Sequence, residues 1–528
     1  MKRKEFHELI PIERAEQILK SIIRGSDTVV PIDLAHHRVL ARDVVASIDV
    51  PSFDRADMDG YAVRAEDTYT AREEARVELE MIGRIPAGDA PTLTIRAGAA
   101  AEISTGAMLP DGADAVVMVE YTEEVGSRVS IQRAVHSWEN VMRAGTDIRC
   151  GTRVLPQGTL LGAREIGVLA AIGVSQVCVR SLAVGIISTG DELVPAGERM
   201  EPGQGRVYDV NAHTIAAAVR ECGATPIMYG IIPDDREKTI EILKKAISEC
   251  DLILTSGSTS AGSGDIMPRI LEEFGEVLAH GINIKPGKPM IIAKMEKPVI
   301  GLPGFPTSAL SMFYFLVAPR LRDLLASEST AAVAAAAGRE HDGYIERAVL
   351  GSRIQSVGRH QLLPVAVVRG FAYPVVKGSG AITALAAADG TIEILPEVEI
   401  MEPGETVEVV LFGERSANDF VIAGMPCDDL NPLIATLPFR VRVINMGVAA
   451  GTYAVRNGIA DVAMLPLRAD ELPDSDDVIV IEGFSHGNGG EAGADAAAYN
   501  FIILRNRIDS DRIRTFLSAL DSFPGRIS

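Results

Sequence analysis

The chain has 528 residues, more than a single hydrophobic core supports, so we expect about three to five domains. Hydrophobic residues make up 47% and charged residues 23% of the chain, a mixture typical of globular rather than disordered proteins. The formal net charge of −21 argues against non-specific binding to nucleic acid or anionic lipid. No apolar stretch reaches the roughly 18 residues of a membrane helix, and no apolar signal segment follows the first residues, so we predict a cytoplasmic protein.

The cysteines and the acidity set two further limits. The five cysteines are scattered and predict neither a disulfide framework nor a zinc site: Cys150, Cys178, Cys222, Cys250 and Cys427. Two like charges about 4 Å apart cost about 4 kcal/mol at an effective dielectric constant of 20. A site for an anionic substrate therefore needs a local cluster of Lys and Arg, or a metal ion.

The patterns along the chain predict several kinds of domain. Residues 40–180 have short apolar runs, many turn signals and little helical period, and they predict β-rich lobes. Between 180 and 325 we expect strands near 183–187, 226–232, 251–254, 290–293 and 299–302, alternating with helices over 211–222, from after 235 to about 247, after 265 and from 307. This alternation predicts a central, doubly wound, mostly parallel α/β sheet, with its ligand crevice beyond the carboxyl ends of the strands.

The remaining segments read differently. Residues 326–338 predict a connector, and 339–413 predict the short strands of a small β-barrel or sandwich. A new pattern begins at residue 414.

A Gly/Ser-rich loop follows one of the central strands, at 255–265 (Thr-Ser-Gly-Ser-Thr-Ser-Ala-Gly-Ser-Gly-Asp). Its small residues allow backbone N–H groups to contact a phosphate, although a flexible connection is the alternative interpretation. Asp265 ends the loop where a helix starts. It either caps that helix or binds Mg²⁺ against substrate phosphates.

Acidic side chains follow two other central strands. Asp191 and Glu192 come after the first, and Asp234 and Asp235 come after the second. Taken alone, each pair is typical of a helix cap or a solvated face. Three acidic loop tips that converge on one crevice favour a metal site or a general base.

Positive charge is concentrated in the segment 284–289 (Ile-Lys-Pro-Gly-Lys-Pro). The prolines stiffen a turn that holds Lys285 and Lys288, where a dianion could bind; a surface turn with incidental lysines is the alternative. Residues 303–308 (Pro-Gly-Phe-Pro-Thr-Ser) follow the last strand and would add backbone donors and a helix N-terminus beside these lysines.

A series of motifs carries a resemblance to a known family. Residues 54–63 (Asp-Arg-Ala-Asp-Met-Asp-Gly-Tyr-Ala-Val) contain Met-Asp-Gly-Tyr-Ala, and further motifs follow at 104–107, 110–116, 143–148, 188–193, 208–211, 255–265, 285–289 and 302–308. Together they resemble the molybdopterin molybdotransferase family, which includes the bacterial molybdenum-insertion enzymes and the E domain of gephyrin. The resemblance covers roughly residues 6–413, with the motifs in the family's order.

The resemblance implies a transferase that inserts molybdate or tungstate into adenylylated molybdopterin and releases AMP, in molybdenum cofactor biosynthesis. It places the pterin and AMP over loops of the central domain, at Ser188, Thr189, Gly190, Ser256, Gly257, Ser258, Ser260, Pro303 and Pro306. It places the oxyanion near Lys285, Lys288, Arg359 and Ser379.

The resemblance also implies catalytic residues, a metal and partners. The catalytic candidates are Asp59, Thr105, Asp147, Glu192, Asp235 and Asp265. Mg²⁺ would be held by Asp265, Asp191 and Glu192. The family's proteins are elongated homodimers, so Asp59, Thr105 and Asp147 would reach the cleft of a partner subunit, and the molybdopterin adenylyltransferase is a further expected partner.

Two positions depart from the family pattern. Ala56-Asp57 stands where Ser-Ala is common before Met-Asp-Gly-Tyr, and Gly257-Ser258 stands where Gly-Gly is common. A serine reaches positive φ less readily than a glycine, so the second change is expected to alter a phosphate contact.

The segment after residue 413 resembles one lobe of a periplasmic-binding-protein-like domain, through residues 419–424 and 446–464. Its length suits one lobe better than two. We therefore expect a single α/β lobe that folds separately, contributes little to catalysis and binds an oxyanion weakly or not at all.

These features predict the following domains: an N-terminal helical segment packing on the central domain (1–32), a linking β-rich domain (33–51 and 152–179), a β-rich lobe with the Met-Asp-Gly-Tyr motif (52–151), the central α/β domain (180–326), a small β-barrel (339–413) and the truncated receptor-like lobe (414–528). Two other functions stay open: adenylyl transfer to the pterin, because the central domain also resembles the adenylating enzymes, and a non-catalytic scaffold or oxyanion sensor.

Overall fold

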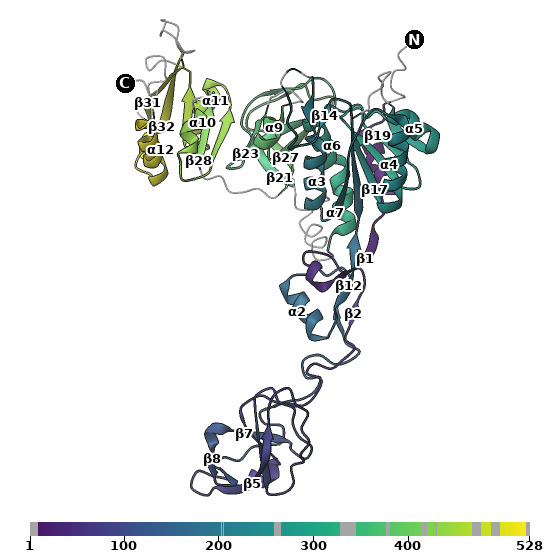
Figure 1. Ribbon diagram of the computed structural model, residues 1–528. Helices are drawn as coiled ribbons and strands as arrows, with labels where there is room; N and C mark the ends of the chain where they lie inside the picture. Colours follow the sequence, from purple (N-terminus) through teal and green to yellow (C-terminus); the bar gives the residue numbers. More distant parts are fainter. Residues whose placement is uncertain are drawn as a thin grey trace. The chain divides into compact units, whose positions relative to one another are not determined.

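The computed structural model of the chain describes residues 9–201, 203, 205–257, 266–327, 345–375, 381–413, 420–425, 427, 430–466, 477–486 and 497–523. The chain forms two compact units (Figure 1). One comprises Met1–Ser26, Ser181–Ala326 and Thr330–Ser528, and the other comprises Asp27–Arg180 with Ser327–Ser329. Within the described ranges, no helix is long and apolar enough to cross a membrane.

The second unit is β-rich, as the sequence predicts. Its largest sheet has the order β7-β4-β6-β5-β9-β8, with β4 at Gly60–Val63, β5 at Val77–Ile85, β6 at Ala99–Ile103, β7 at Ala115–Met118, β8 at Thr122–Val125 and β9 at Arg128–Ile131. Three two-stranded pairs accompany it: β1 (Ser26–Pro31) with β12 (Gln176–Ser181), β2 (Val44–Val45) with β11 (Arg153–Leu155), and β3 (Arg55–Ala56) with β10 (Val141–Met142). A helix that the sequence analysis did not predict, α2 at Ala163–Ala171, also lies in this unit.

The first unit contains a six-stranded central sheet of order β16-β13-β17-β20-β19-β18. The strands are β13 (Ala183–Thr189), β16 (Thr225–Ile232), β17 (Leu252–Ser256), β18 (Glu276–His280), β19 (Ile291–Lys294) and β20 (Pro298–Leu302). The first four in this order are parallel, whereas β19 and β18 are antiparallel. The parallel strands and β19 were predicted from the sequence, whereas β18 was not.

Helices cover both faces of this sheet, so its inner strands β13, β17 and β20 are buried on both sides (Figure 1). Leu252 and Leu254 of β17 belong to a core cluster with α1 (Ile12–Ile22), α3 (Asn211–Glu221) and α6 (Pro306–Met312). Ile253, between them, belongs to a second cluster with α4 (Arg236–Glu249) and α5 (Met267–Phe274). This alternation follows from the two-residue period of a strand.

The helix expected from residue 307 is not continuous. After α6 comes a π-helical stretch at Phe313–Val317, followed by α7 at Ala318–Leu325. Pro319 lies in the first turn of α7 and has no backbone N–H to donate to the preceding turn. The regular α-helical hydrogen-bond pattern is therefore interrupted where the sequence analysis expected an unbroken helix.

The expected small barrel is present and closed. Its strand order is β21-β24-β23-β25-β27, formed by Ile345–Leu350 (β21), Gln361–Val368 (β23), Phe371–Pro374 (β24), Gly390–Ile394 (β25) and Thr406–Leu411 (β27). A short pair, β22 (Ile354–Gln355) with β26 (Ile400–Met401), and helix α9 (Ile382–Ala387) lie in the same segment.

The C-terminal residues form a five-stranded sheet of order β29-β28-β30-β32-β31. The strands are β28 (Phe420–Gly424), β29 (Val441–Asn445), β30 (Val462–Leu465), β31 (Val478–His486) and β32 (Ala497–Leu504), with helices α10 (Leu430–Ala435), α11 (Val448–Arg456) and α12 (Asp511–Asp521). We call these elements the C-terminal lobe.

One of the two apolar clusters of the C-terminal lobe is shared with the barrel, and the other, around Phe420, Leu433 and Phe516, is the lobe's own. Val368 and Tyr373 of the barrel are 0% and 1% exposed, and both belong to the same apolar cluster as Ile444, Ala454 and Val455 of the lobe. The shared cluster shows a contact between the lobe and the barrel, and the expectation that residues 414–528 fold separately stays a prediction. The hydrophobic pattern of the sequence could not reveal this shared cluster. Apolar residues that pack against a neighbouring domain show the same pattern as apolar residues that pack within their own domain.

Candidate active site

Three loops meet at the carboxyl edge of the central sheet, and Asn211 joins two of them. Its Nδ2 donates to Ser256 Oγ over 2.6 Å and to the carbonyl oxygen of Gly304 over 2.7 Å. Thr189 Oγ1 donates to the carbonyl oxygen of Ser256 over 3.3 Å. The ends of β13, β17 and β20 are therefore held together around the first residue of α3.

The close approach of these loops explains a glycine. Gly257 has a φ of +92°, and a Cβ at this position would lie 2.2 Å from the carbonyl oxygen of Thr189. A side chain here would force the two loops apart. The loop that begins at residue 255 thus starts from a fixed backbone, while Ser258, Ser260 and Asp265 lie outside the described residues.

Buried polar groups gather around the same edge. Ser188, Thr255 and Asn211 are 0%, 1% and 7% exposed. Ser188 Oγ, Thr255 Oγ1 and Asn211 Oδ1 have no hydrogen-bond partner among the described residues, and neither do Thr307 Oγ1 and Ser311 Oγ of α6. A buried polar atom without a partner costs about 1–3 kcal/mol, so a cluster of them indicates a functional rather than a purely structural edge.

The acidic residues of this edge lie on two adjacent loops. Asp191 Oδ1 accepts the backbone N–H of Asp234 over 3.1 Å, and Gly190 N–H donates to the carbonyl oxygen of Ile232 over 3.3 Å. The Glu192 carboxylate lies beside Gly190, because a Cβ on that glycine would be 2.5 Å from Glu192 Oε2. The structure thus brings Asp191 and Glu192 to the mouth of β13, where both are exposed.

Asp235 has a structural contact. Its carboxylate accepts the backbone N–H of Lys238 over 3.0 Å and so caps α4. This is the alternative that the sequence left open for the acidic pair after β16. In the part of the chain that the structure describes, no group of three or more His, Cys, Asp or Glu side chains is arranged to hold a metal ion.

The lysine turn contacts both α6 and the barrel. Gly287, with a φ of +115°, lies against Met312 of α6, since a Cβ there would be 2.2 Å from the sulfur atom. The backbone N–H of Lys285 donates to the carbonyl oxygen of His360 over 2.9 Å, and Leu362 N–H donates to the carbonyl oxygen of Lys285 over 2.8 Å. Lys285 therefore lies against Gln361, the first residue of β23, and Arg359 is two residues before Gln361 in the sequence.

Charge and burial fit an anion at this place. Lys285, Lys288 and Arg359 are all exposed residues. Behind them, His360 is 8% exposed, and its Nε2 lies 2.6 Å from Glu393 Oε1 of β25. The turn and the barrel loop thus concentrate cations in a chain whose net charge is −21. Ser379 lies outside the described residues.

The predicted residues Asp59, Thr105 and Asp147 lie in the second compact unit. The backbone N–H of Thr105 donates to Asp59 Oδ1 over 2.7 Å, so these two residues are neighbours. Gly60 pairs with β7 so closely that a Cβ would lie 1.9 Å from the carbonyl oxygen of Val117. That contact accounts for the glycine of Met-Asp-Gly-Tyr. Asp147 is exposed, and its N–H donates to the carbonyl oxygen of Val50 over 3.1 Å.

Both compact units match family models of known proteins. A family model described as the MoeA N-terminal region (domains I and II) matches residues 10–173. A second, described as "Probable molybdopterin binding domain", matches 185–323, and a third, the MoeA C-terminal region (domain IV), matches 347–412. None of these three matches extends past residue 412.

Named relatives agree with these matches. The chain is 32% identical over 420 residues to the molybdopterin molybdenumtransferase of Bacillus subtilis, which covers 78% of this chain and 96% of that protein. It is 39% identical over 302 residues to the molybdopterin molybdenumtransferase of a Nostoc species, covering 56% of this chain and 69% of that protein. The chain belongs to the molybdopterin molybdenumtransferase family.

A solved structure of this family has the same fold. The crystal structure of a molybdopterin biosynthesis MoeA protein from Pyrococcus horikoshii has a TM-score of 0.60 and 40% sequence identity, and it covers 77% of this chain and 100% of that protein. The likeness supports a multidomain arrangement of α/β and β-rich parts with a small barrel for this family member.

Two residues at the edge of the central sheet of this molybdenumtransferase-family chain were not among the predicted site residues. Asn211 ties the loops together, and its signal was present in the motif at 208–211 (Tyr-Asp-Val-Asn). Phe305 precedes α6 and is 62% exposed, an unusual position for a large aromatic side chain. Of its two flanking prolines, Pro303 is buried and Pro306 begins α6, where a proline lacks no helical hydrogen bond.

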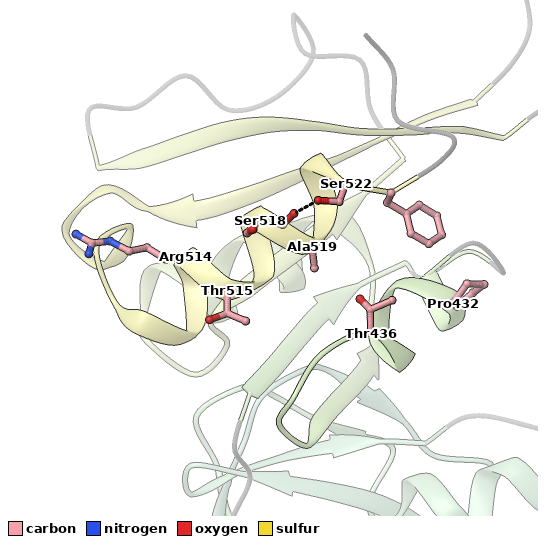
Figure 2. A pocket seen from close by; sticks show the side chains of 8 residues that line it. Pro432, Thr436, Arg514, Thr515, Ser518, Ala519 and Ser522 are labelled. Carbon is pink, nitrogen blue, oxygen red and sulfur yellow. Dashed lines mark hydrogen bonds between the residues drawn. The ribbon is translucent and has the colours of Figure 1, made fainter.

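Two hollows in this chain lie away from these residues. A groove of about 780 Å³ runs between α10 and α12 (Figure 2). Its hydroxyl groups bond within their own helices: Thr436 Oγ1 donates to the carbonyl oxygen of Leu433, and Ser522 Oγ donates to that of Ser518. A second pocket, of about 720 Å³, lies where residues 374–375 of the barrel face residues 443–447 of the C-terminal lobe.

Proposed function

We propose that this chain inserts molybdate or tungstate into adenylylated molybdopterin and releases AMP. As a member of the molybdopterin molybdenumtransferase family, the chain is a transferase of molybdenum cofactor biosynthesis. One observation carries the finer proposal. The Lys285–His360 bridge places the lysine turn of the central domain against the barrel loop that contains Arg359.

The oxyanion would bind at this junction. A doubly charged oxyanion is attracted by Lys285, Lys288 and Arg359, and Ser379 would add a hydroxyl donor. Charge-assisted hydrogen bonds from such groups are roughly twice as strong as neutral ones. Molybdate and tungstate are nearly the same size and charge, so the proposal covers both.

The pterin and AMP would bind over the three joined loops of the central domain. The proposed contacts come from Ser188, Thr189, Gly190, Ser256, Gly257, Ser258, Ser260, Pro303 and Pro306. The positive end of α6 and the Gly/Ser backbone favour phosphate there. The proposal takes the central domain as doubly wound, with the domain boundaries expected above, and the core clusters on both faces of its sheet support the first part.

Carboxylates would assist the reaction. Glu192, Asp235 and Asp265 are the proposed catalytic groups of this domain, and Asp191, Glu192 and Asp265 would hold Mg²⁺. The donor set fits that ion, which typically uses one or two carboxylates together with phosphate oxygens and does not need a closed protein cage. When bound, Mg²⁺ would neutralise charge on the phosphates.

The partners form the last part of the proposal. Asp59, Thr105 and Asp147 would reach the cleft of a second subunit in a homodimer, and the molybdopterin adenylyltransferase would deliver the substrate in the cytoplasm. The support is the family's motif at 54–63 and the contact between Asp59 and Thr105.

The C-terminal lobe gives little support to an oxyanion sensor. Among the described residues that line its pocket against the barrel, none is Lys or Arg. In the groove between α10 and α12, Arg514 is paired with Asp509 over 2.8 Å. An oxyanion without a cation would lose its hydration shell without compensation.

A product assay tests the proposed function. The purified chain is incubated with adenylylated molybdopterin, Mg²⁺ and either oxyanion, and AMP release and metal incorporation are both followed. Incorporation that depends on oxyanion and accompanies AMP release is the expected result. Formation of adenylylated pterin from ATP would instead identify an adenylyltransferase, and oxyanion binding without turnover would identify a sensor.

A further inference from the structure

Strand β23 of the barrel runs from the lysine turn to the C-terminal lobe. Its first residue, Gln361, pairs with Lys285 of the lysine turn. Its last residues, Val367 and Val368, lie where the barrel meets the C-terminal lobe. A strand of this length spans about 23 Å from end to end and is stiff along its axis. Contacts at the far end therefore bear on the position of the end beside Lys285.

The first contact with the lobe comes from the turn after β23. Arg369 Nη2 lies 2.9 Å from each carboxylate oxygen of Asp461, and its Nη1 donates to the carbonyl oxygen of Gly458 over 2.7 Å. Asp461 Oδ2 also accepts the backbone N–H of Val421 over 2.8 Å, and Asp461 is 14% exposed. The carboxylate is thus fixed by the lobe and presented to the barrel.

Arg369 has a backbone conformation that is unusual for an arginine. Arg369 and Gly370 form the two-residue turn between β23 and β24, with φ values of 49° and 82°. Positive φ values at both central positions are typical of a type I′ turn, whose first position favours Asn, Asp or Gly. Arginine is a poor choice for this backbone. Its contact with Asp461 and Gly458 supplies the reason for its presence.

A second charged contact lies on the neighbouring strand of the barrel. Arg442 of β29 is 2.6 Å from Asp389 Oδ2, which also accepts the backbone N–H of Val367 over 2.7 Å. The two side chains are 18% and 13% exposed. Asp389 directly precedes β25, the strand that contains Glu393. Both Arg–Asp contacts therefore attach to the two strands that hold the His360–Glu393 pair.

Apolar residues of the barrel and of the lobe also belong to one buried cluster, beside the pocket that lies between residues 374–375 and 443–447. Val368 and Tyr373, with Phe371 beside them, pack on Ile444 and Met446 of the lobe. Burial raises the pKa of the Tyr373 hydroxyl to about 12, in agreement with its 1% exposure. A buried apolar cluster together with charged pairs is the pattern of a specific interface rather than a casual contact.

We propose that the C-terminal lobe is a docked positioning element for the oxyanion site. Through Arg369–Asp461 and Arg442–Asp389 it fixes β23 and β25, and these strands in turn hold His360 and Arg359 against Lys285. The second half of this inference rests on the proposed function of Lys285 and Arg359. The first half, that the lobe is docked on the barrel, does not.

The test uses Arg369→Asn in the full chain. Asparagine suits a type I′ turn better than arginine, so this change removes the contacts of Arg369 with Asp461 and Gly458 without harming the hairpin. Backbone hydrogen exchange is then measured by mass spectrometry, together with the kinetics of AMP release. We expect exchange at least about tenfold faster in β23 and in α11, because docking protects both.

The kinetic expectation is a split between the two substrates. The KM for molybdate should rise about three- to tenfold, while the KM for adenylylated molybdopterin stays within about twofold of the original value, because only the barrel half of the site is loosened. A purely structural role would lower the amount of active enzyme and leave both KM values unchanged.

Arg347→Gln is the matched control, because Arg347 pairs with Glu408 on the same barrel at an exposed position. Such exposed pairs contribute little, so exchange and both KM values should not change. Unchanged exchange in β23 of Arg369→Asn would overturn the part of Arg369 in the docking, and unchanged exchange after Arg442→Gln is added as well would overturn the docking itself. Faster exchange with an unchanged KM for molybdate would overturn the positioning role. If the unaltered chain released no AMP, the positioning role would fall with the proposed function, and exchange would still decide the docking.

Discussion

The carbonyl oxygen of His360 accepts the backbone N–H of Lys285 over 2.9 Å. This hydrogen bond joins a turn of the central domain to a loop of the barrel. In a second one, Leu362 N–H donates to the carbonyl oxygen of Lys285 over 2.8 Å. Two residues 75 positions apart thus form one short piece of sheet. In the proposed oxyanion site, this pairing would let the cations on either side of it act on the same anion.

The lysine turn gives the first prediction. Lys285→Ala and Lys288→Ala should each raise the KM for molybdate about 10- to 100-fold, since a hydrogen bond to a charged group contributes about 1.5–3 kcal/mol. Both side chains are exposed, so the melting temperature should change little. Lys294→Ala, at an exposed position of β19, is the control. A melting temperature that falls by many degrees with an unchanged KM would show the lysines to be structural.

Asn211 gives the second prediction. Asn211→Ala leaves Ser256 Oγ and the Gly304 carbonyl without this donor at a buried place, which costs about 1–3 kcal/mol. The KM for adenylylated molybdopterin should rise about tenfold, measured by AMP release at saturating molybdate. Thr214→Ala on the same helix is the control, because that hydroxyl bonds to the backbone at Val210 and Asn211. Equal effects of the two changes would count against a special role for Asn211.

The third prediction concerns Mg²⁺. Asp191→Asn, Glu192→Gln and Asp265→Asn should each raise the Mg²⁺ concentration needed for half-maximal AMP release, because each removes a proposed ligand charge. Asp235→Ala should behave differently: loss of the α4 cap lowers the free energy of unfolding by about 1 kcal/mol. Identical Mg²⁺ titrations for all variants and the unaltered chain would leave these carboxylates as helix caps and loop contacts.

Much of the fold was predictable because local patterns match single elements. The strands that became β13, β17 and β20 are short apolar runs that are buried on both faces, whereas β16, at the edge of the sheet, is an apolar run that is only partly buried. β18 was missed because Glu276–His280 shows no such run; its pairing with β19 compensates for a weak local signal. Register and neighbours of that kind are tertiary facts.

The site was predictable to a lesser degree. Gly/Ser loops and the lysine turn are visible as residue types, but the double contact of Asn211 depends on where β20 ends relative to α3. The docking of the lobe was invisible for the same reason: Arg369, Arg442, Asp389 and Asp461 are scattered charges until the chain folds. A residue such as Arg369 in a type I′ turn is the one local clue, because it contradicts the turn's preference.

Assembly gives the fourth prediction. If Asp59 acts in the cleft of a partner subunit, mixing Asp59→Asn chains with Lys285→Ala chains should restore about a quarter of the unaltered activity, because about half of the dimers are then heterodimers and each holds one intact site of two. Neither variant alone should regain activity on self-mixing. Demonstrated subunit exchange without any recovery would place the complete site within one chain.

Truncation gives the last prediction. A separately folding tail would let a chain ending at residue 413 keep its activity. The shared cluster leads us to expect the opposite, because the cut exposes Val368, Phe371 and Tyr373 and leaves Asp389 without Arg442. At about 25 cal/mol per Å², roughly 40 Å² of newly exposed apolar surface costs about 1 kcal/mol. A loss of about 1 kcal/mol should lower the melting temperature of the barrel by roughly 4–8 °C.

The same truncated chain should show a raised KM for molybdate, for the reason given for Arg369→Asn. Trp138, the only tryptophan in the sequence, belongs to the other compact unit, and its fluorescence transition serves as an internal control that should not shift. A truncated chain that melts at the original temperature and keeps the original KM would restore the independent tail. Calorimetry showing tight molybdate or tungstate binding to residues 414–528 alone would then make that tail a sensor, since a lobe that neither stabilises the barrel nor positions the site would have binding as its remaining role.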